Sequence, residues 1–286
     1  MLLAIRNLYN YLTVSVFDVI FRSILSIYVL VYFDLESFAI FGFFNALTIF
    51  YSLAFDLGLQ KQLPLLIYKY KARFFDIVLG SVWRNFIITS IISIVVVLGF
   101  FNIYLSLWSL VIILLRSLFS NICNYNFIYL QYVGRSGQYS IIFFTRTALY
   151  VGFSFLAVIY ISPDPLYIIS ADLFANLFIV IFFIDKRKGF LNAYKSGSSI
   201  KKKFLKISLE RASLIYGEFV DWLLNGGDRV IIGNFLAIKN LAFISFFYTL
   251  SASLRPILIP LKNFIAPALN NLFIEEKDYA QLKKLN

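Results

Sequence analysis

The chain has 286 residues, of which 60% are hydrophobic and 14% charged, with 26 basic against 15 acidic residues. Soluble domains are only about half apolar and about a quarter charged, so an ordinary soluble fold is excluded. Apolar runs longer than 18 residues favour membrane-spanning helices over the short alternating strands of a barrel. The composition therefore predicts an all-α, polytopic membrane protein.

Eight apolar segments, each long enough to cross a bilayer, follow one another along the chain. They lie at about 12–33, 38–57, 75–101, 104–130, 140–161, 166–184, 209–236 and 241–261. The first is not followed by a small-residue cleavage pattern, so we expect it to remain as a span. Residues 61–73 form a basic, polar stretch, and residues 131–137 have the glycines and polarity of a tight loop.

Basic residues are unevenly divided between the two sides that these spans define. If the amino terminus is inside, the inner segments hold eighteen of the 26 basic residues and the outer turns hold only Lys239. Lysine and arginine crowd the cytoplasmic side of membrane proteins, so both termini are predicted to be cytoplasmic. The net charge of +11 then reflects this topology, and we do not expect nucleic-acid binding.

Histidine is absent, and Cys123 is the single cysteine. A lone cysteine in an apolar segment provides neither a disulfide framework nor a cysteine metal site. Without histidine, the commonest general base and metal ligand are missing. We therefore expect no catalytic residue, no metal site and no bound cofactor.

The seventh apolar segment is unusual because it carries several charges. They are Glu218, Asp221, Asp228 and Arg229. A charge at mid-membrane costs about 2.5 to 3.5 kcal/mol on insertion scales, so a simple anchor would not retain them. Glu218 and Asp221 are three residues apart and share one helix face. This segment predicts one wall of a polar cavity inside the membrane. Asp18 and Arg22, four apart in the first span, can partly neutralise one another.

The chain also contains a candidate internal repeat, found by shifting it by 203 residues. The matched pairs are Asp18 with Asp221, Ala39 with Ala242, Phe43 with Phe246, Phe44 with Phe247 and Leu47 with Leu250. The shift preserves orientation, so the halves would be parallel repeats about an axis normal to the membrane. We expect a six-helix bundle at 1–185, a basic cytoplasmic linker at 186–206, two helices of a second bundle at 207–273 and an amphipathic tail at 274–286. The chain would then be a larger transporter cut short.

Four short motifs lie at the start of the second span, at its end, after the fourth span and in the seventh span. They are Phe38-Ala39-Ile40-Phe41, Asp56-Leu57-Gly58-Leu59, Leu130-Gln131-Tyr132-Val133-Gly134-Arg135 and Trp222-Leu223-Leu224-Asn225-Gly226-Gly227-Asp228-Arg229-Val230-Ile231-Ile232-Gly233. In this order they resemble the polysaccharide transporter family, the Wzx-type flippases of the multidrug, oligosaccharide-lipid and polysaccharide exporter superfamily. Members have two six-helix bundles and about 12 to 14 spans, so a chain with eight departs from the pattern.

The resemblance implies a transporter that flips a polyprenyl-diphosphate-linked oligosaccharide across a bacterial or archaeal cytoplasmic membrane by alternating access. Other polysaccharide-assembly membrane proteins would be its partners. Guanidinium suits the diphosphate because its fork donates two parallel hydrogen bonds and stays charged. The candidate binding residues are Arg22, Arg84, Arg116, Arg146, Arg229 and Arg255. The other interpretation is that each reaches a lipid headgroup or serves a structural ion pair.

Carboxylates and helix-breaking residues supply two further predicted roles. The candidates for coupling to a proton or sodium gradient are Asp18, Glu218, Asp221 and Asp228, whose alternative role is to neutralise neighbouring arginines. The candidate hinge residues are Gly226, Gly227, Pro256 and Pro260. The glycine pair equally suits close helix packing.

Three other functions compete with this one. A drug exporter of the same superfamily fits less well, because arginines at membrane level favour anionic cargo. A membrane glycosyltransferase would use Asp34 and Glu36 as its acidic pair, but this turn is too short to build a donor site around it. A polysaccharide polymerase would need a larger outer loop than the sequence offers.

Overall fold

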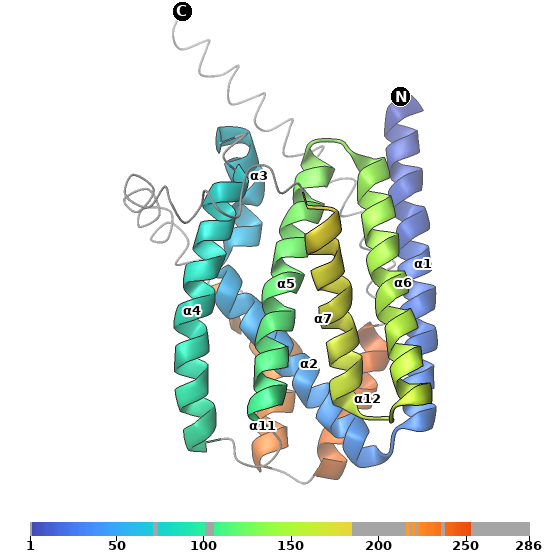
Figure 1. The fold of residues 1–286 in the computed structure, drawn as a ribbon, viewed down its shortest axis with the longest axis vertical. Coiled ribbons are helices and arrows are strands. Elements are labelled where there is room, and N and C mark those ends of the chain that lie inside the picture. The colour runs from blue at the N-terminus through green and yellow to red at the C-terminus, as the bar shows by residue number, and fades with distance from the viewer. Residues whose placement is uncertain are drawn as a thin grey trace, which may run out of the picture.

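The computed structural model describes residues 2–70, 74–100, 106–184, 216–217, 219–220, 222–235 and 238–252. Within these ranges every regular element is a helix (Figure 1). They are α1 (Leu2–Tyr32), α2 (Leu35–Asp56), α3 (Leu59–Tyr70), α4 (Phe74–Phe100), α5 (Leu107–Tyr132), α6 (Ser136–Tyr160), α7 (Pro165–Phe182), η2 (Leu223–Gly227), α11 (Asp228–Phe235) and α12 (Ile238–Ala252). Five of them, namely α1, α2, α5, α6 and α7, are long and apolar enough to cross a membrane. The all-α, polytopic membrane fold is thus confirmed, and the count of eight spans stays a prediction.

The distribution of side chains is inverted relative to a soluble protein. Large aliphatic residues such as Ile24 and Ile27 face outward from α1, with 48% and 62% of their surfaces exposed. Polar side chains are instead buried between helices, among them Asn121, Asp172 and Asn176. Water would penalise such a surface, whereas lipid tails accept it. The bundle therefore carries its polarity inside.

Helices α2, α5 and α7 begin at the lower end of the bundle in Figure 1, and each begins with a capping residue. Asp34 accepts a hydrogen bond from the Ser37 backbone N–H at 2.7 Å at the start of α2. Ser106 caps α5 in the same way, and Asp164 caps α7, whose first residue is Pro165. These caps satisfy amide groups that the first helical turn leaves without partners. They fix where α2, α5 and α7 start.

The opposite end carries tight turns and one helix that the sequence interpretation missed. Gly58 and Gly134 both have φ of +74°, a conformation that glycine adopts without strain. The tight loop expected at 131–137 is a short turn between α5 and α6. The stretch after Gly58 was interpreted only as polar, yet it forms α3, which buries Leu59, Leu63 and Leu66 on one face. That four-then-three spacing is helical and was overlooked among the lysines.

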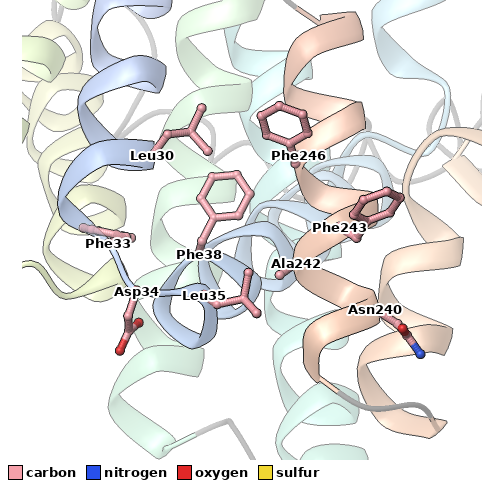
Figure 2. A pocket seen from close by; sticks show the side chains of 9 residues that line it. All are labelled: Leu30, Phe33, Asp34, Leu35, Phe38, Asn240, Ala242, Phe243 and Phe246. Atoms are coloured by element: carbon pink, nitrogen blue, oxygen red, sulfur yellow. The ribbon is translucent and has the colours of Figure 1, made fainter.

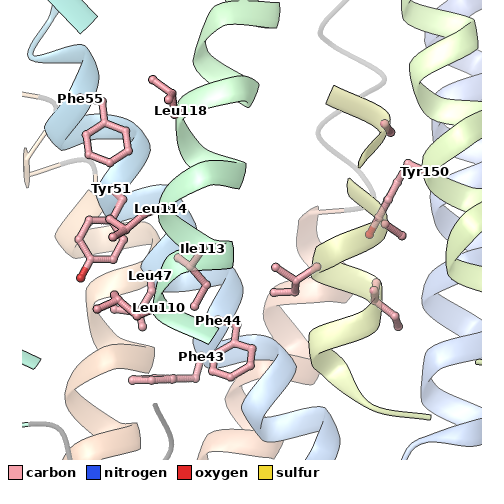
Figure 3. Packing of buried hydrophobic residues seen from close by; sticks show 14 of the residues in the cluster. Phe43, Phe44, Leu47, Tyr51, Phe55, Leu110, Ile113, Leu114, Leu118 and Tyr150 are labelled. Carbon is pink, nitrogen blue, oxygen red and sulfur yellow. The ribbon is translucent and has the colours of Figure 1, made fainter. Parts of the chain in front are cut away.

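The helices pack so that α2 lies at the centre of the described structure. On one side of the bundle, α1 packs on α6, α6 packs on α7, and α7 packs on α5. Helix α2 contacts α4, α5, α7, α11 and α12. Its main apolar contact with α5 includes Leu47, Phe55, Ile113 and Leu118 (Figure 3). Helix α4 lies at the opposite edge of the bundle from α1 and α6 (Figure 1).

Small residues bring α12 close to α2. A side chain added at Gly42 would overlap the side chain of Ser245 on α12. Ala39 and Ala242 are both fully buried on these two helices. Gly42 and Ser245 are separated by 203 residues, as are Ala39 and Ala242, so the contact joins positions that the shifted alignment pairs. The repeat itself and the four predicted domains stay predictions, and the linker at 186–206 and the tail at 274–286 lie outside the described residues.

Candidate functional site

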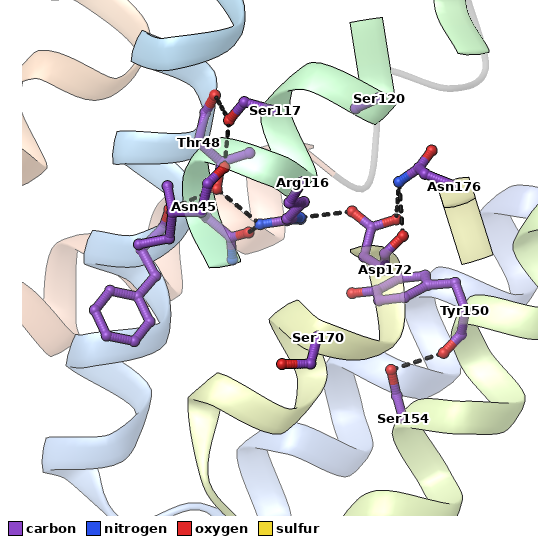
Figure 4. Close-up of polar contacts among 12 residues, drawn as sticks. Asn45, Thr48, Arg116, Ser117, Ser120, Tyr150, Ser154, Ser170, Asp172 and Asn176 are labelled. Carbon is purple, nitrogen blue, oxygen red and sulfur yellow. Dashed lines mark hydrogen bonds and ion pairs between the residues drawn. The ribbon is translucent and has the colours of Figure 1, made fainter. Parts of the chain in front are cut away.

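The centre of the candidate site is the ion pair between Arg116 on α5 and Asp172 on α7. Arg116 Nε lies 2.7 Å from Asp172 Oδ2, and both side chains are about nine-tenths buried. Arg116 Nη1 also donates to Asn45 Oδ1 at 2.9 Å and to Thr48 Oγ1 at 3.0 Å, both on α2 (Figure 4). One guanidinium therefore links three helices, and its planar fork is well suited to such a contact.

A second arginine approaches the same carboxylate from α6. Arg146 Nη2 lies 3.8 Å from Asp172 Oδ1 and 3.5 Å from Ser120 Oγ, which are longer separations than those of Arg116. The Asp172 side chain is held on its other side by Asn176 Nδ2, which donates to Oδ1 at 3.0 Å. Asp172 is thus the shared counter-ion of two arginines, and it makes its short ion pair with only one of them.

The third arginine, Arg22, belongs to a neighbouring pair on α1. Its Nε donates to Asp18 Oδ1 at 2.8 Å, as the four-residue spacing predicted. Thr147 on α6 donates to the same carboxylate oxygen at 2.7 Å. The Arg22 guanidinium lies 5.7 Å from the ring centre of Tyr150, which itself lies beside Asp172 (Figure 4). Tyr150 therefore stands between the two ion-paired groups.

These groups lie far from either end of their helices. At 1.5 Å rise per residue, Arg22 is roughly 15 Å from the end of α1 and Arg116 roughly 14 Å from the start of α5. Half of a hydrocarbon core is about 15 Å, so both arginines are at mid-membrane depth. Among the described residues, Arg22, Arg116 and Arg146 form ion pairs with Asp18 and Asp172, which leaves one excess positive charge. The arrangement can attract an anion into the interior of the bundle.

The remaining predicted site residues are spread over other parts of the chain. Arg84 is exposed on α4, the helix at the edge of the bundle opposite α1 and α6 (Figure 1). Arg229 is buried on α11, and its guanidinium lies 3.7 Å from the ring centre of Tyr248 on α12. Asp228 is exposed and accepts a hydrogen bond from the Arg229 backbone N–H at 2.7 Å. The structure therefore brings together Arg22, Arg116, Arg146 and Asp18, but not these residues.

The predicted hinge at Gly226 and Gly227 falls in a short π-helical turn, Leu223–Gly227. Such wide turns interrupt the regular helix and often mark positions where a helix bends. Gly227 is also buried, and a side chain there would press on Leu223 and Trp222. Bending and close packing both fit this position. The predicted residues Arg255, Glu218, Asp221, Pro256 and Pro260 lie outside the described residues.

The sequence interpretation missed the residue that organises the site. Asp172 lies within the predicted span at 166–184, yet the sequence interpretation gave no role to it, to Asn45 or to Thr48. The signal was present, because an ionisable residue inside an apolar segment is a functional candidate by default. Asn176, four residues later, shares the helix face of Asp172 and reinforces that signal.

Two other features of the described structure are separate from this cluster. Asp56, at the end of α2, accepts hydrogen bonds from Tyr125 Oη at 2.6 Å and from the Gln60 backbone N–H, which places it as a helix cap. An apolar groove of about 350 Å³ lies between the lower ends of α1 and α2 and helix α12, with Asp34 and Asn240 at its rim (Figure 2). Among the described residues, no group of His, Cys, Asp and Glu side chains could hold a metal ion.

Comparisons of the chain with models of protein families, with curated proteins and with solved structures found no match. The helices and the buried ion pairs by themselves define a class of protein: an all-α, multi-pass membrane protein with a charged, hydrogen-bonded interior. The resemblance to the polysaccharide transporter family rests on short motifs of this sequence alone.

Proposed function

We propose that the protein is a membrane transporter for an anionic lipid-linked oligosaccharide, moving a polyprenyl-diphosphate-linked sugar from the cytoplasmic to the outer leaflet. The observation that carries this proposal is the gathering of three arginines from three helices around Asp18 and Asp172, which leaves one positive charge in excess. Arg116 and Arg146 are buried between the helices, and Arg22, with 44% of its side chain exposed, lies at their edge. Anionic cargo is favoured there, because guanidinium pairs with phosphate through parallel hydrogen bonds. Binding of the lipid-linked sugar, together with a proton or sodium gradient across the membrane, would drive the protein between its inward-facing and outward-facing states.

The ends of the bundle support an orientation for this transport. Lys61 and Arg135 lie near the end that carries the α5–α6 turn, whereas Asp34, Glu36 and Asp164 lie at the other end (Figure 1). Basic residues are retained on the cytoplasmic side, so the first end would face the cytoplasm. The proposed function implies a bacterial or archaeal cytoplasmic membrane, where other membrane proteins of polysaccharide assembly would take over the translocated lipid.

Transport can be tested with the purified full chain in proteoliposomes that contain a labelled polyprenyl-diphosphate-linked oligosaccharide. Movement between leaflets is read from the label that becomes protected from an enzyme added outside. We expect Arg22→Ala and Arg146→Ala to lower the initial rate at least about tenfold. Arg135→Ala is the matched control, because it removes an equally positive but exposed charge in a turn. Equal rates for wild type and Arg22→Ala, with both proteins folded, would end the proposal.

The same vesicles separate transport from the competing functions. A drug exporter would move a lipophilic cation and ignore the diphosphate lipid, a preference opposite to the charge of the cluster. A glycosyltransferase or polymerase would lengthen the sugar, which mass spectrometry of the recovered lipid detects. In the structure, Asp34 of the proposed acidic pair is engaged as the cap of α2. We therefore expect the lipid to be recovered unchanged.

A further inference from the structure

The two arginines that share Asp172 are unequally satisfied. Arg116 makes short bonds to Asp172, Asn45 and Thr48, between 2.7 and 3.0 Å. Arg146 approaches Asp172 no closer than 3.8 Å, and in the described structure its buried Nε has no hydrogen-bond partner. Burying a guanidinium N–H without a hydrogen-bond partner costs free energy, so a ligand that offers an acceptor to this N–H would be bound favourably.

Asp172 cannot satisfy both arginines because its oxygens are already divided. Oδ2 is bonded to Arg116, and Oδ1 accepts from Asn176 while facing Arg146 at a distance. In a lipid-linked sugar each phosphorus of the diphosphate carries two terminal oxygens, so the whole group offers four acceptors and can accept from two guanidinium forks at once. A phosphate in this place would therefore offer both arginines short bonds.

The geometry points to Asp172 as a resident substitute for the cargo's phosphate, a carboxylate that occupies the anion position between Arg116 and Arg146 until a phosphate displaces it. This inference rests on the proposed function and goes further, because it names the group that competes with cargo. The group of Arg116, Arg146 and Asp172 is closed in this structure, with about a tenth of each of these three side chains exposed. A phosphate can reach the guanidiniums only if Asp172 yields its place.

Asn176 makes such an exchange feasible within α7. It lies one turn beyond Asp172 and donates both to the Asp172 carboxylate at 3.0 Å and to its carbonyl at 2.7 Å. A displaced carboxylate would therefore keep one hydrogen bond on its own helix. When cargo leaves, Asp172 would return to the arginines and prevent rebinding. Asp172 is thus a positioning residue that limits affinity and speeds release.

The test measures the binding of farnesyl diphosphate, a short prenyl diphosphate, to the purified full chain in detergent by calorimetry. Farnesol serves as the phosphate-free probe, so any contribution of the apolar tail is subtracted. We expect Asp172→Asn to lower the Kd at least about tenfold, because the internal competitor loses its charge. Asp18→Asn is the charge-matched comparison: it removes the same charge from the same cluster but not from between Arg116 and Arg146. We expect a change of less than about threefold for it.

Each result decides between the two proposals. A Kd of Asp172→Asn equal to that of wild type, together with binding that Arg116→Ala abolishes, overturns the role of Asp172 and leaves the proposed function standing. Absence of diphosphate binding in all proteins overturns the proposed function itself. If Asp172→Asn does not fold, Arg146→Gln and Arg146→Gln/Asp172→Asn replace it. The double variant should then bind farnesyl diphosphate about tenfold more tightly than Arg146→Gln.

Discussion

The two sides of α2 are built in different ways. Toward α5 and α7, Asn45 and Thr48 accept hydrogen bonds from Arg116, and apolar side chains fill the space around them. Toward α12, Gly42 meets Ser245 with no room for a larger side chain. The first contact depends on charge and hydrogen bonds, and the second depends on the fit of small residues.

This difference teaches which contact can change during a transport cycle. A charged side chain can exchange one hydrogen-bond partner for another, including water or a ligand, and still make nearly the same number of hydrogen bonds. Closely packed helices have no such alternative. Lipid tails can replace the van der Waals contacts between the helices only after the two backbones have separated. Trp222 strengthens this side further, since its Nε1 donates to the Ala46 carbonyl on α2 at 3.4 Å. We expect α2 and α12 to move as one body against α5, α6 and α7.

The largest effect is expected on the charged side, from Arg116→Met. The substitution keeps much of the volume but removes the short bond to Asp172, whose remaining cation, Arg146, is 3.8 Å away. Breaking a buried pair by removing one partner typically costs about 3 to 5 kcal/mol. Thermal unfolding in detergent, followed by tryptophan fluorescence, should show the lower stability.

The double variant Arg116→Met/Asp172→Asn tests whether that loss comes from the buried carboxylate charge that Arg116→Met leaves without its short ion pair. Replacing both partners removes the unpaired charge, so we expect the double variant to be more stable than Arg116→Met alone. If the two variants unfold together, the ion pair contributes little, and the contrast between the two sides of α2 must rest on packing alone.

The small-residue side is tested by Gly42→Leu, with an expected loss of about 1 to 3 kcal/mol because overpacking forces α12 away from α2. Gly152→Leu is the matched control: Gly152 lies exposed on α6, and a side chain there meets no atom within 4 Å. That change should be neutral or slightly stabilising, since leucine favours helix over glycine. A loss at Gly152 equal to that at Gly42 would show that the close approach of Gly42 to Ser245 is not what makes the substitution at Gly42 destabilising.

Much of this architecture was accessible from the sequence because the membrane simplifies the problem. A long apolar run has to be a helix in lipid, so the five confirmed spans were placed within a few residues of their ends. The pair Asp18 and Arg22 was predictable because helical spacing alone brings them together. In both cases the information is local, and no knowledge of neighbouring helices is required.

The rest depended on tertiary contacts that one sequence does not encode visibly. Arg116 and Asp172 are 56 residues apart, and nothing in either segment indicates that α5 and α7 are neighbours. Arg84 has the same chemistry as Arg116 in a similarly apolar segment, yet its helix lies at the far edge of the bundle. The sequence therefore identified the residue type of the site, whereas the structure was needed to select its members.

A smaller effect is expected within the charged side from Thr147→Val. This nearly isosteric change removes the hydrogen bond of 2.7 Å from Thr147 to Asp18 while the ion pair with Arg22 remains. Hydrogen bonds between membrane helices average about 0.6 kcal/mol and reach about 1.7 kcal/mol. The unfolding temperature of this variant should fall by less than that of Gly42→Leu. An effect as large as that of Arg116→Met would mean that Asp18, rather than Asp172, dominates the cluster.

The smallest effect is expected at Asp34, where α2 begins, outside both contacts. The backbone N–H of Ser37 donates to the carboxylate and holds the pKa of Asp34 below its ordinary value of 3.8. A carboxyl group whose pKa is lowered by folding stabilises the fold above its unfolded pKa. That contribution disappears as the pH falls through the folded pKa. Asp34→Ala should therefore lower the unfolding temperature by about one or two degrees at pH 7.

The pH profile distinguishes the cap from a general effect of charge. The gap in unfolding temperature between wild type and Asp34→Ala should be complete above about pH 5 and should close as the pH falls below 3.8. Glu36→Ala is the control, since it removes a neighbouring exposed negative charge in the first turn of α2 but no capping bond. A gap that persists unchanged at pH 3 would mean that Asp34 supports α2 through contacts of its neutral side chain. A contribution of that kind would belong with the small-residue side of α2 rather than with its charged side.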